Sequence, residues 1–134
     1  MIAQIDVELA TIQMLRATPG VTALVPAASI TTQLPPNPMY PHVLIQRASG
    51  QMLTWVTIDA PVVQVDVMGT TQGQASRAML AVRAAILGLA STVVPEGVLE
   101  SATEQIGPSW LPDTVSVPPV PRYTAHFEII TRPL

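Results

Sequence analysis

Cysteine is absent from this sequence, and so is lysine. Without cysteine the chain has no disulfide, no thiolate nucleophile and no cysteine metal site. Charged residues make up only 11% of the chain, well below the usual quarter or so. The few cations are all arginines and are scattered, so we expect no phosphate-binding patch and no specific reading of DNA. A chain this poor in charge is expected to bury much of its surface in an assembly.

Long hydrophobic runs are also absent. No apolar stretch approaches the ~18 residues of a membrane-spanning helix, and the amino terminus lacks a basic patch followed by an apolar core. We therefore expect neither a membrane span nor a signal peptide. The length of 134 residues predicts a single domain over residues 1–134. Prolines gather at 35–41 and 108–121, which indicates ordered but irregular loops.

Residues 60–89 predict one strand followed by one long helix. Valines alternate with polar residues at 63–67, which is typical of a half-buried strand. The run 69–74 supplies hydroxyls for the start of a helix; it lacks the lysine and the glycine spacing of a phosphate loop. The helix then carries one apolar stripe that is expected to cover the strand. The stripe consists of Ala75, Met79, Val82, Ile86 and Leu89.

The same helix carries a second apolar line formed by Leu80 and Leu87, and its only charged residues are Arg77 and Arg83. A helix that is apolar on most of its circumference is expected to be buried on more than one side. The second cover is either another element of this chain or another copy of it. Farther along, Trp110 and Leu111 lie in an irregular stretch and are poor neighbours for solvent. We predict a subunit interface that includes Leu80, Leu87, Trp110 and Leu111.

The remaining segments complete an α+β pattern. A first helix with an apolar stripe ends near Ala17, a short apolar turn follows at 21–25, and 27–41 is expected to be an extended surface loop. Strands are predicted at 42–49, 52–58, 98–106 and 122–131, with a turn at Ser49–Gly50, a loop at 93–97 and an irregular segment at 107–121. The strand at 98–106 has a mixed face that favours a sheet edge. The order predicts an α+β fold: an antiparallel (mixed) β-sheet with two main helices packed on one face.

No catalytic constellation is found, and we predict no catalytic residue, no cofactor and no metal site. His126 and Glu128 share one face of the last strand, which is typical of a polar outer sheet face. Two histidines without cysteines make a poor metal-ligand set. The alternative is a small-ligand or enzyme module that uses His126, Glu128 and Arg122. It would require these three groups to converge on one pocket.

Acidic residues suggest one further surface. Glu100 and Glu104, with Asp66, form either an ordinary solvated strand face or part of a lumen that repels a DNA backbone, the reverse of binding through counterion release. In the second case the duplex slides past without sticking.

Three segments in this order resemble the tail-completion or tail-terminator proteins of long-tailed bacteriophages. The first is LVPAASITTQLPPNPMYPHVLIQRASG at 24–50, the second VVQVDVMGTTQGQASRAMLAVRAAILGL at 62–89, and the third YTAHFEIITRP at 123–133. The most specific parts are the proline and strand at Pro41–Arg47 and the strand, polar turn and helix at Val63–Ile86. All of these are fold positions and none is a chemical signature.

The resemblance implies a non-enzymatic subunit of a ring, expected to be a hexamer, at the head-proximal end of a tail tube. There it would end tube polymerisation and join the tail to the head connector. The implied partners are further copies of the chain, the tail tube protein and a head–tail connector or stopper protein, with DNA passing through the lumen without specific binding. Glu100 and Glu104 are the residues expected to face that lumen. The implied location is the virion, after assembly in the host cytoplasm, and another neck component, a connector or stopper, remains the alternative.

Overall fold

The computed structural model describes residues 3–54 and 58–134 and has a mixed α+β fold, with a six-stranded curled sheet and three helices. The helices and the 3-10 turn are α1 (Val7–Arg16), α2 (Pro19–Thr22), η1 (Ala27–Ser29) and α3 (Gln72–Leu87). The strands are β1 (Ile30–Thr31), β2 (His42–Thr54), β3 (Ile58–Met68), β4 (Thr92–Val94), β5 (Gly97–Trp110) and β6 (Arg122–Arg132).

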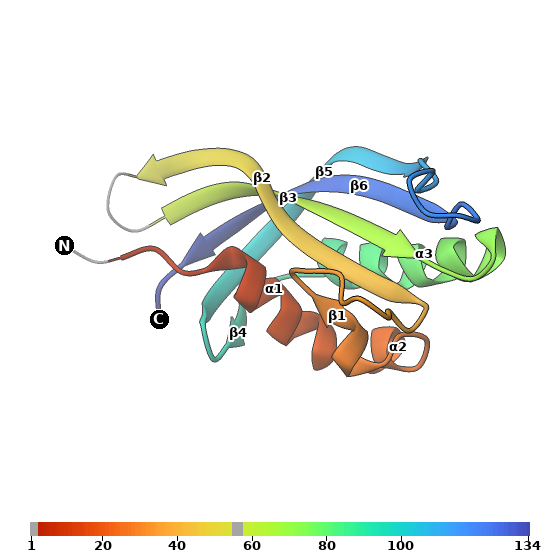
Figure 1. Ribbon diagram of the computed structural model, residues 1–134. Helices are drawn as coiled ribbons and strands as arrows, with labels where there is room; N and C mark the ends of the chain where they lie inside the picture. The colour runs from red at the N-terminus through yellow and green to blue at the C-terminus, as the bar shows by residue number, and fades with distance from the viewer. Residues whose placement is uncertain (1–2, 55–57) are drawn as a thin grey trace.

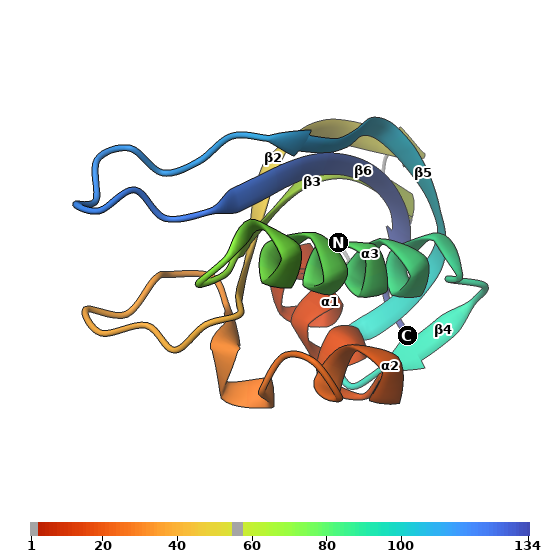
Figure 2. The same ribbon diagram turned by 90° about the vertical axis from the view of Figure 1, so that its right-hand side faces the viewer.

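The sheet has the strand order β1-β2-β3-β6-β5-β4. Among the described strands β1 and β2 are parallel and the other neighbours are antiparallel, which makes the sheet mixed as the sequence predicts. Figure 1 shows the β2–β3 hairpin extending away from the helices at the end of the molecule where both termini lie. Figure 2 shows the strands arching over α3. The side of the sheet toward α3 is called the concave face below, and the other side the convex face.

The polar run at 69–74 starts α3, as predicted. The Thr71 hydroxyl accepts a hydrogen bond from the Gln74 amide at 3.1 Å. The Gln74 side chain in turn accepts one from the Thr70 amide at 2.7 Å. Two backbone donors that the helix cannot satisfy internally thus find side-chain partners, in a pattern close to a capping box.

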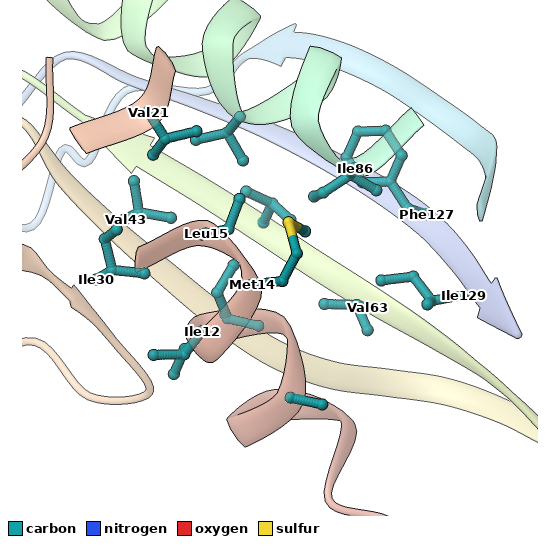
Figure 3. Packing of buried hydrophobic residues seen from close by; sticks show 14 of the residues in the cluster. Ile12, Met14, Leu15, Val21, Ile30, Val43, Val63, Ile86, Phe127 and Ile129 are labelled. Carbon is teal, nitrogen blue, oxygen red and sulfur yellow. The ribbon is translucent and has the colours of Figure 1, made fainter. Parts of the chain in front are cut away.

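The predicted stripe of α3 is buried, and it packs in one core with α1 and the sheet. The members Ala75, Met79, Val82 and Ile86 are at most 1% exposed and Leu89 is 8% exposed. Figure 3 shows Ile86 of α3 near Phe127 and Ile129 of β6, with Met14 and Leu15 of α1 in the same cluster. The alternation in β6 is also confirmed, because Ala125, Phe127 and Ile129 are all fully buried.

The turn predicted at Ser49–Gly50 is wrong. Strand β2 continues through these residues, and a register shift between Arg47 and Ser49 relative to β3 forms a β-bulge. Gly50 adopts φ 105° there, and an added Cβ would lie 2.3 Å from the Ala60 carbonyl oxygen. A serine–glycine pair marks a bulge as well as it marks a turn, because both need the conformational freedom of glycine. The predicted strand at 52–58 therefore supplies the end of β2 and the start of β3, and its residues 55–57 lie outside the described part.

Three predicted loops contain more strand than expected. The segment 93–97 is a tight hairpin, in which β4 pairs with the start of β5 from Thr92 to Leu99. Strand β5 extends to Trp110 and so includes the first residues of the predicted irregular stretch at 107–121. The loop predicted at 27–41 contains η1 and β1 before its proline-rich part. Beyond Glu100 no described strand pairs with the outer side of β5, so most of this strand is a sheet edge, as its mixed face indicates.

Candidate functional site

Two proline-rich loops, 32–41 and 111–121, lie side by side at one end of the sheet (Figure 2). The second loop is closed by two backbone hydrogen bonds of 2.9 Å between Asp113 and Val120. The Asp113 carboxylate also accepts hydrogen bonds from the Val115 amide and the Ser116 hydroxyl, both at 3.0 Å, and these bonds lower the pKa of Asp113. The loop at 111–121 is therefore ordered by its own contacts, although it lacks helix and strand.

A groove of about 470 Å³ runs between the two loops. Its described walls are mostly apolar and carry no charged side chain; they include Leu34, Tyr40, Val117 and the prolines of both loops. Beside it, Met39 is 73% exposed, Val115 92% and Val117 95%. An uncharged groove with exposed apolar side chains around it is typical of a surface that contacts another protein.

Trp110 and Leu111 lie at the base of the second loop. The ring of Trp110 packs against Tyr123 of the neighbouring strand with centroids 5.3 Å apart. The Tyr123 hydroxyl accepts a hydrogen bond from Gln72 at the start of α3, at 3.0 Å. Trp110 remains 45% exposed and Leu111 51%. The base of the loop is thus fixed to the sheet and to α3 while both predicted interface residues stay open to solvent.

Leu80 and Leu87 lie on the side of α3 away from the core. They are 53% and 39% exposed, so no described part of the same chain provides the second cover for this line. Their neighbours on the exposed side are small, with Ala84 and Gly88 also exposed. Of the two arginines on the helix, Arg77 is exposed and Arg83 is bound to Glu104. The outer side of α3 is therefore an apolar ridge with an exposed cation at its beginning.

Glu100 and Glu104, the predicted lumen residues, both form ion pairs on the edge strand β5. Glu104 accepts two hydrogen bonds from Arg83 of α3, at 2.5 and 2.8 Å. Glu100 accepts one from Arg132 at 2.5 Å and one from the Ser91 hydroxyl at 2.8 Å. These hydrogen bonds lower the pKa of both carboxyl groups. The region is thus close to neutral, and it ties β5 to α3 and β6.

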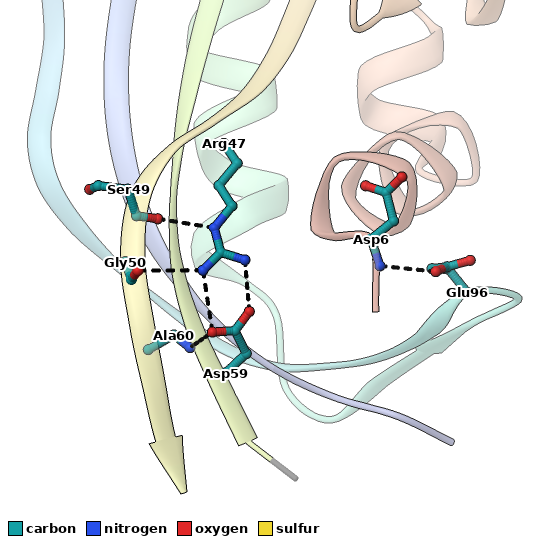
Figure 4. Close-up of polar contacts among 7 residues, drawn as sticks. All are labelled: Asp6, Arg47, Ser49, Gly50, Asp59, Ala60 and Glu96. Carbon is teal, nitrogen blue, oxygen red and sulfur yellow. Dashed lines mark hydrogen bonds and ion pairs between the residues drawn. The ribbon is translucent and has the colours of Figure 1, made fainter. Parts of the chain in front are cut away.

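The base of the β2–β3 hairpin is held by an ion pair that the sequence analysis missed. Arg47 binds Asp59 and also donates to the carbonyl oxygens of Ser49 and Gly50 (Figure 4). One pattern in the sequence could have indicated this pair: Arg47 and Asp59 have opposite charges, lie in two successive predicted strand segments, and are separated only by uncharged residues. A second contact in Figure 4 joins distant parts of the chain, because the Asp6 amide at the start of α1 donates to Glu96 in the β4–β5 turn at 2.9 Å.

The three residues of the enzyme alternative do not converge. His126 and Glu128 share the convex face of β6, but no hydrogen bond joins them among the described residues. Arg122 donates to the Leu111 carbonyl oxygen at 2.8 Å, at the loop end of the strand. Glu128 lines a shallow hollow whose described lining includes neither His126 nor Arg122. Within residues 3–54 and 58–134, no group of three His, Asp or Glu side chains is placed to hold a metal ion.

Comparisons with known proteins point to a structural component of a phage tail. The family described as "Tail completion protein gp17" matches residues 10–107. A solved chain from the "Virion of native gene transfer agent (GTA) particle" has a similar fold, with a TM-score of 0.62 and 22% identity over 93% of each chain. A search of curated proteins finds no match. No helix in the described part of the chain is long and apolar enough to cross a membrane.

The fold, the open apolar surfaces and these comparisons define a virion-associated structural protein of the phage-tail class. The chain belongs to the tail completion protein gp17 family, whose pattern covers most of its length.

Proposed function

We propose that this chain is a ring-forming subunit, a hexamer by expectation, at the head-proximal end of a phage tail tube. In this role it ends tube polymerisation and joins the tail to the head connector. The observation that carries the proposal is the combination of membership in the tail completion family with exposed apolar groups on two separate parts of one small chain. A lone monomer gains nothing from exposing these groups, whereas a subunit with neighbours on several sides buries them.

We assign the subunit interface to Leu80, Leu87, Trp110 and Leu111. All four are between 39% and 53% exposed. Three of them lie in α3 or β5, and the Leu111 amide donates to the Arg122 carbonyl oxygen, so their backbone is already ordered and less entropy is lost on association. The proline-rich loops are assigned to the tube protein or the connector above or below the ring. Proline fixes the backbone of these loops before binding, so less conformational entropy is lost when they bind a partner.

We assign β5 to the wall of the lumen, with Glu100 and Glu104 facing it. The pairing of these carboxylates with Arg132 and Arg83 leaves few net charges there. A nearly neutral wall offers no cluster of cations to hold a DNA backbone, so the duplex can pass without specific binding. We propose no enzymatic role, because His126, Glu128 and Arg122 do not meet in one pocket of the described chain.

Polymerisation of the cognate tail tube protein tests this function. Purified chain is added in increasing amounts to tube protein during assembly, and tube lengths are measured by electron microscopy. The proposal predicts that mean tube length falls as the added protein increases, with density for a terminal ring at one end only. Tubes of unchanged length with no bound ring would overturn the terminator role. Binding to the purified connector without any effect on tubes would instead favour the stopper alternative.

A further inference from the structure

One cation and one carboxylate stand apart from all others in the described part of the chain. Arg77 makes no hydrogen bond or ion pair with any described residue, and neither does Glu128. Every other arginine donates to a carbonyl or carboxylate oxygen. Every other aspartate and glutamate accepts a hydrogen bond. Three ion pairs form among the described residues, and the other charged side chains except Arg77 and Glu128 are hydrogen-bonded to backbone or neutral groups. A cation and a carboxylate that make no such bond of their own are free to meet across an interface between two copies.

These two residues lie on opposite sides of the molecule. Glu128 sits in β6 between Phe127 and Ile129, which are both fully buried in the core with α3. Because successive side chains of a strand point to opposite faces, Glu128 points to the convex face. Arg77 lies on α3 beneath the concave face, next to the buried Ala78, and is itself exposed. Arg77 and Glu128 therefore cannot meet within one subunit but can meet between two.

The surroundings of both residues are suited to such a contact. Glu128 borders a hollow of about 420 Å³ and is the only charged residue in its described lining, beside Gly50, Gln51 and Gln105. Arg77 stands at the beginning of the ridge on α3, one turn before the exposed Leu80. Arg77 also lines a separate hollow of about 480 Å³ between α3 and α2. The ridge is thus cationic at its beginning, while the hollow on the convex face is anionic.

We infer that Arg77 of one copy pairs with Glu128 of the next copy, with the α3 ridge seated over the hollow on the convex face. The inference rests on the ring of the proposed function and names the surfaces that join its subunits. Two different surfaces on opposite sides of a subunit form a heterologous contact, which closes into a ring when the rotation between neighbours allows it. The second copy of the chain is the occupant because it carries the matching charge.

Charge reversal tests the pairing through the oligomeric state. The variants Arg77→Glu and Glu128→Arg each place like charges face to face at every interface. Each is expected to raise the concentration for half-assembly at least about tenfold, because like charges at an interface are strongly unfavourable. Mass is measured by light scattering at a series of concentrations, with circular dichroism to verify that each variant is folded. Val93→Glu, which introduces a charge at an exposed position of β4, is the control and is expected to assemble like the parent.

An equimolar mixture of the Arg77→Glu and Glu128→Arg proteins tests whether these two positions meet each other. In a ring where the variants alternate, the glutamate introduced at position 77 meets the arginine introduced at position 128, and the native Arg77 meets the native Glu128. The equimolar mixture is therefore expected to recover the parent mass. Full assembly of either variant alone, or failure of the mixture while the parent forms a discrete oligomer, would overturn the pairing and leave the ring intact. A parent that stays monomeric at all concentrations would contradict the ring and this inference together.

Discussion

Arg47 and Asp59 face each other across the β2–β3 hairpin, with Nη1 2.8 Å from Oδ2 and Nη2 3.3 Å from Oδ1. The Asp59 side chain is 5% exposed and that of Arg47 38%. The same guanidinium reaches the carbonyl oxygens of Ser49 and Gly50, where the bulge interrupts the pairing of the two strands. A nearly buried carboxylate is thus neutralised by the side chain that also fixes the bulge. The ion pair therefore ties the bulge in β2 to Asp59 at the start of β3.

Arg47→Ala is expected to lower the free energy of unfolding by about 2–3 kcal/mol, because it leaves the buried Asp59 carboxylate unpaired. Urea denaturation measures the loss. Arg132→Ala is the matched control, since it breaks a more exposed ion pair with Glu100 and should cost clearly less than Arg47→Ala. Equal losses in the free energy of unfolding for the two variants would contradict the larger contribution expected of the Arg47–Asp59 pair.

Gly50→Ala is expected to destabilise the protein by more than about 1 kcal/mol, because the residue has φ 105° and its new Cβ would lie 2.3 Å from the Ala60 carbonyl oxygen. Gly73→Ala is the control: it lies in the first turn of α3 with no described atom near the new Cβ, and alanine favours the helix there. Thermal unfolding of both variants measures the contrast. A Gly50→Ala protein as stable as the Gly73→Ala protein would contradict the bulge.

We expect His42 to make the free energy of unfolding depend on pH. It is 1% exposed, and burial lowers its pKa from 6.5. Thr31 Oγ1 lies 2.8 Å from both the Gln33 carbonyl oxygen and His42 Nε2. Since the hydroxyl proton goes to the carbonyl, Nε2 carries the imidazole proton and donates. Nδ1 is buried without a partner among the described residues, so a second proton on the ring would have no acceptor.

The sign of this dependence follows from the lowered pKa. The folded state holds the proton less tightly than the unfolded state, so the free energy of unfolding is highest above pH 6.5 and falls as the pH drops below it. The variant His42→Gln cannot titrate, and its stability is expected to stay level between about pH 7 and 5. Denaturation at several pH values measures both curves. A parent protein with no loss of stability over this interval would contradict the assignment.

A separate loss is expected in stronger acid. The pKa values of Glu100, Glu104 and Asp113 lie below their usual values because each accepts side-chain hydrogen bonds. Their contribution is complete above about pH 4.5 and disappears as the pH falls through the lowered values. Replacing Glu104 by glutamine is expected to reduce this acid limb and to leave the His42 limb unchanged. Acid denaturation of the parent and the variant measures the difference, and identical curves below about pH 4.5 would contradict it.

Leu80→Asp is expected to prevent assembly while the fold is retained, because Leu80 is 53% exposed and does not belong to the core cluster. Val93→Asp is the matched control, since Val93 is 64% exposed on β4, away from the proposed interface. Analytical ultracentrifugation of both variants and the parent gives the oligomeric state. Equal assembly of the Leu80→Asp protein and the parent would remove the α3 ridge from the interface.

The sequence predicted the elements whose pattern is local. The stripe of α3 and the alternation in β6 repeat with a fixed period, so they identify the buried side without any knowledge of the fold. Features that depend on how strands pair across the sheet are harder to predict from sequence. Ser49–Gly50 fits a turn and a bulge equally well in sequence, and only the register with β3 decides between them. The sequence also does not predict that Glu104 is bound to Arg83 or that the two proline-rich loops lie side by side, because these contacts join segments far apart in the chain.

Closure of the chain into a ring is tested by the solution mass of the purified protein. Light scattering is measured over a concentration series from well below to well above the range in which the protein begins to associate. We expect a change from monomer to one discrete oligomer near six subunits, with no further growth, because a closed ring has no free interface left. A mass that stays at one subunit throughout, or one that grows without limit, would contradict it.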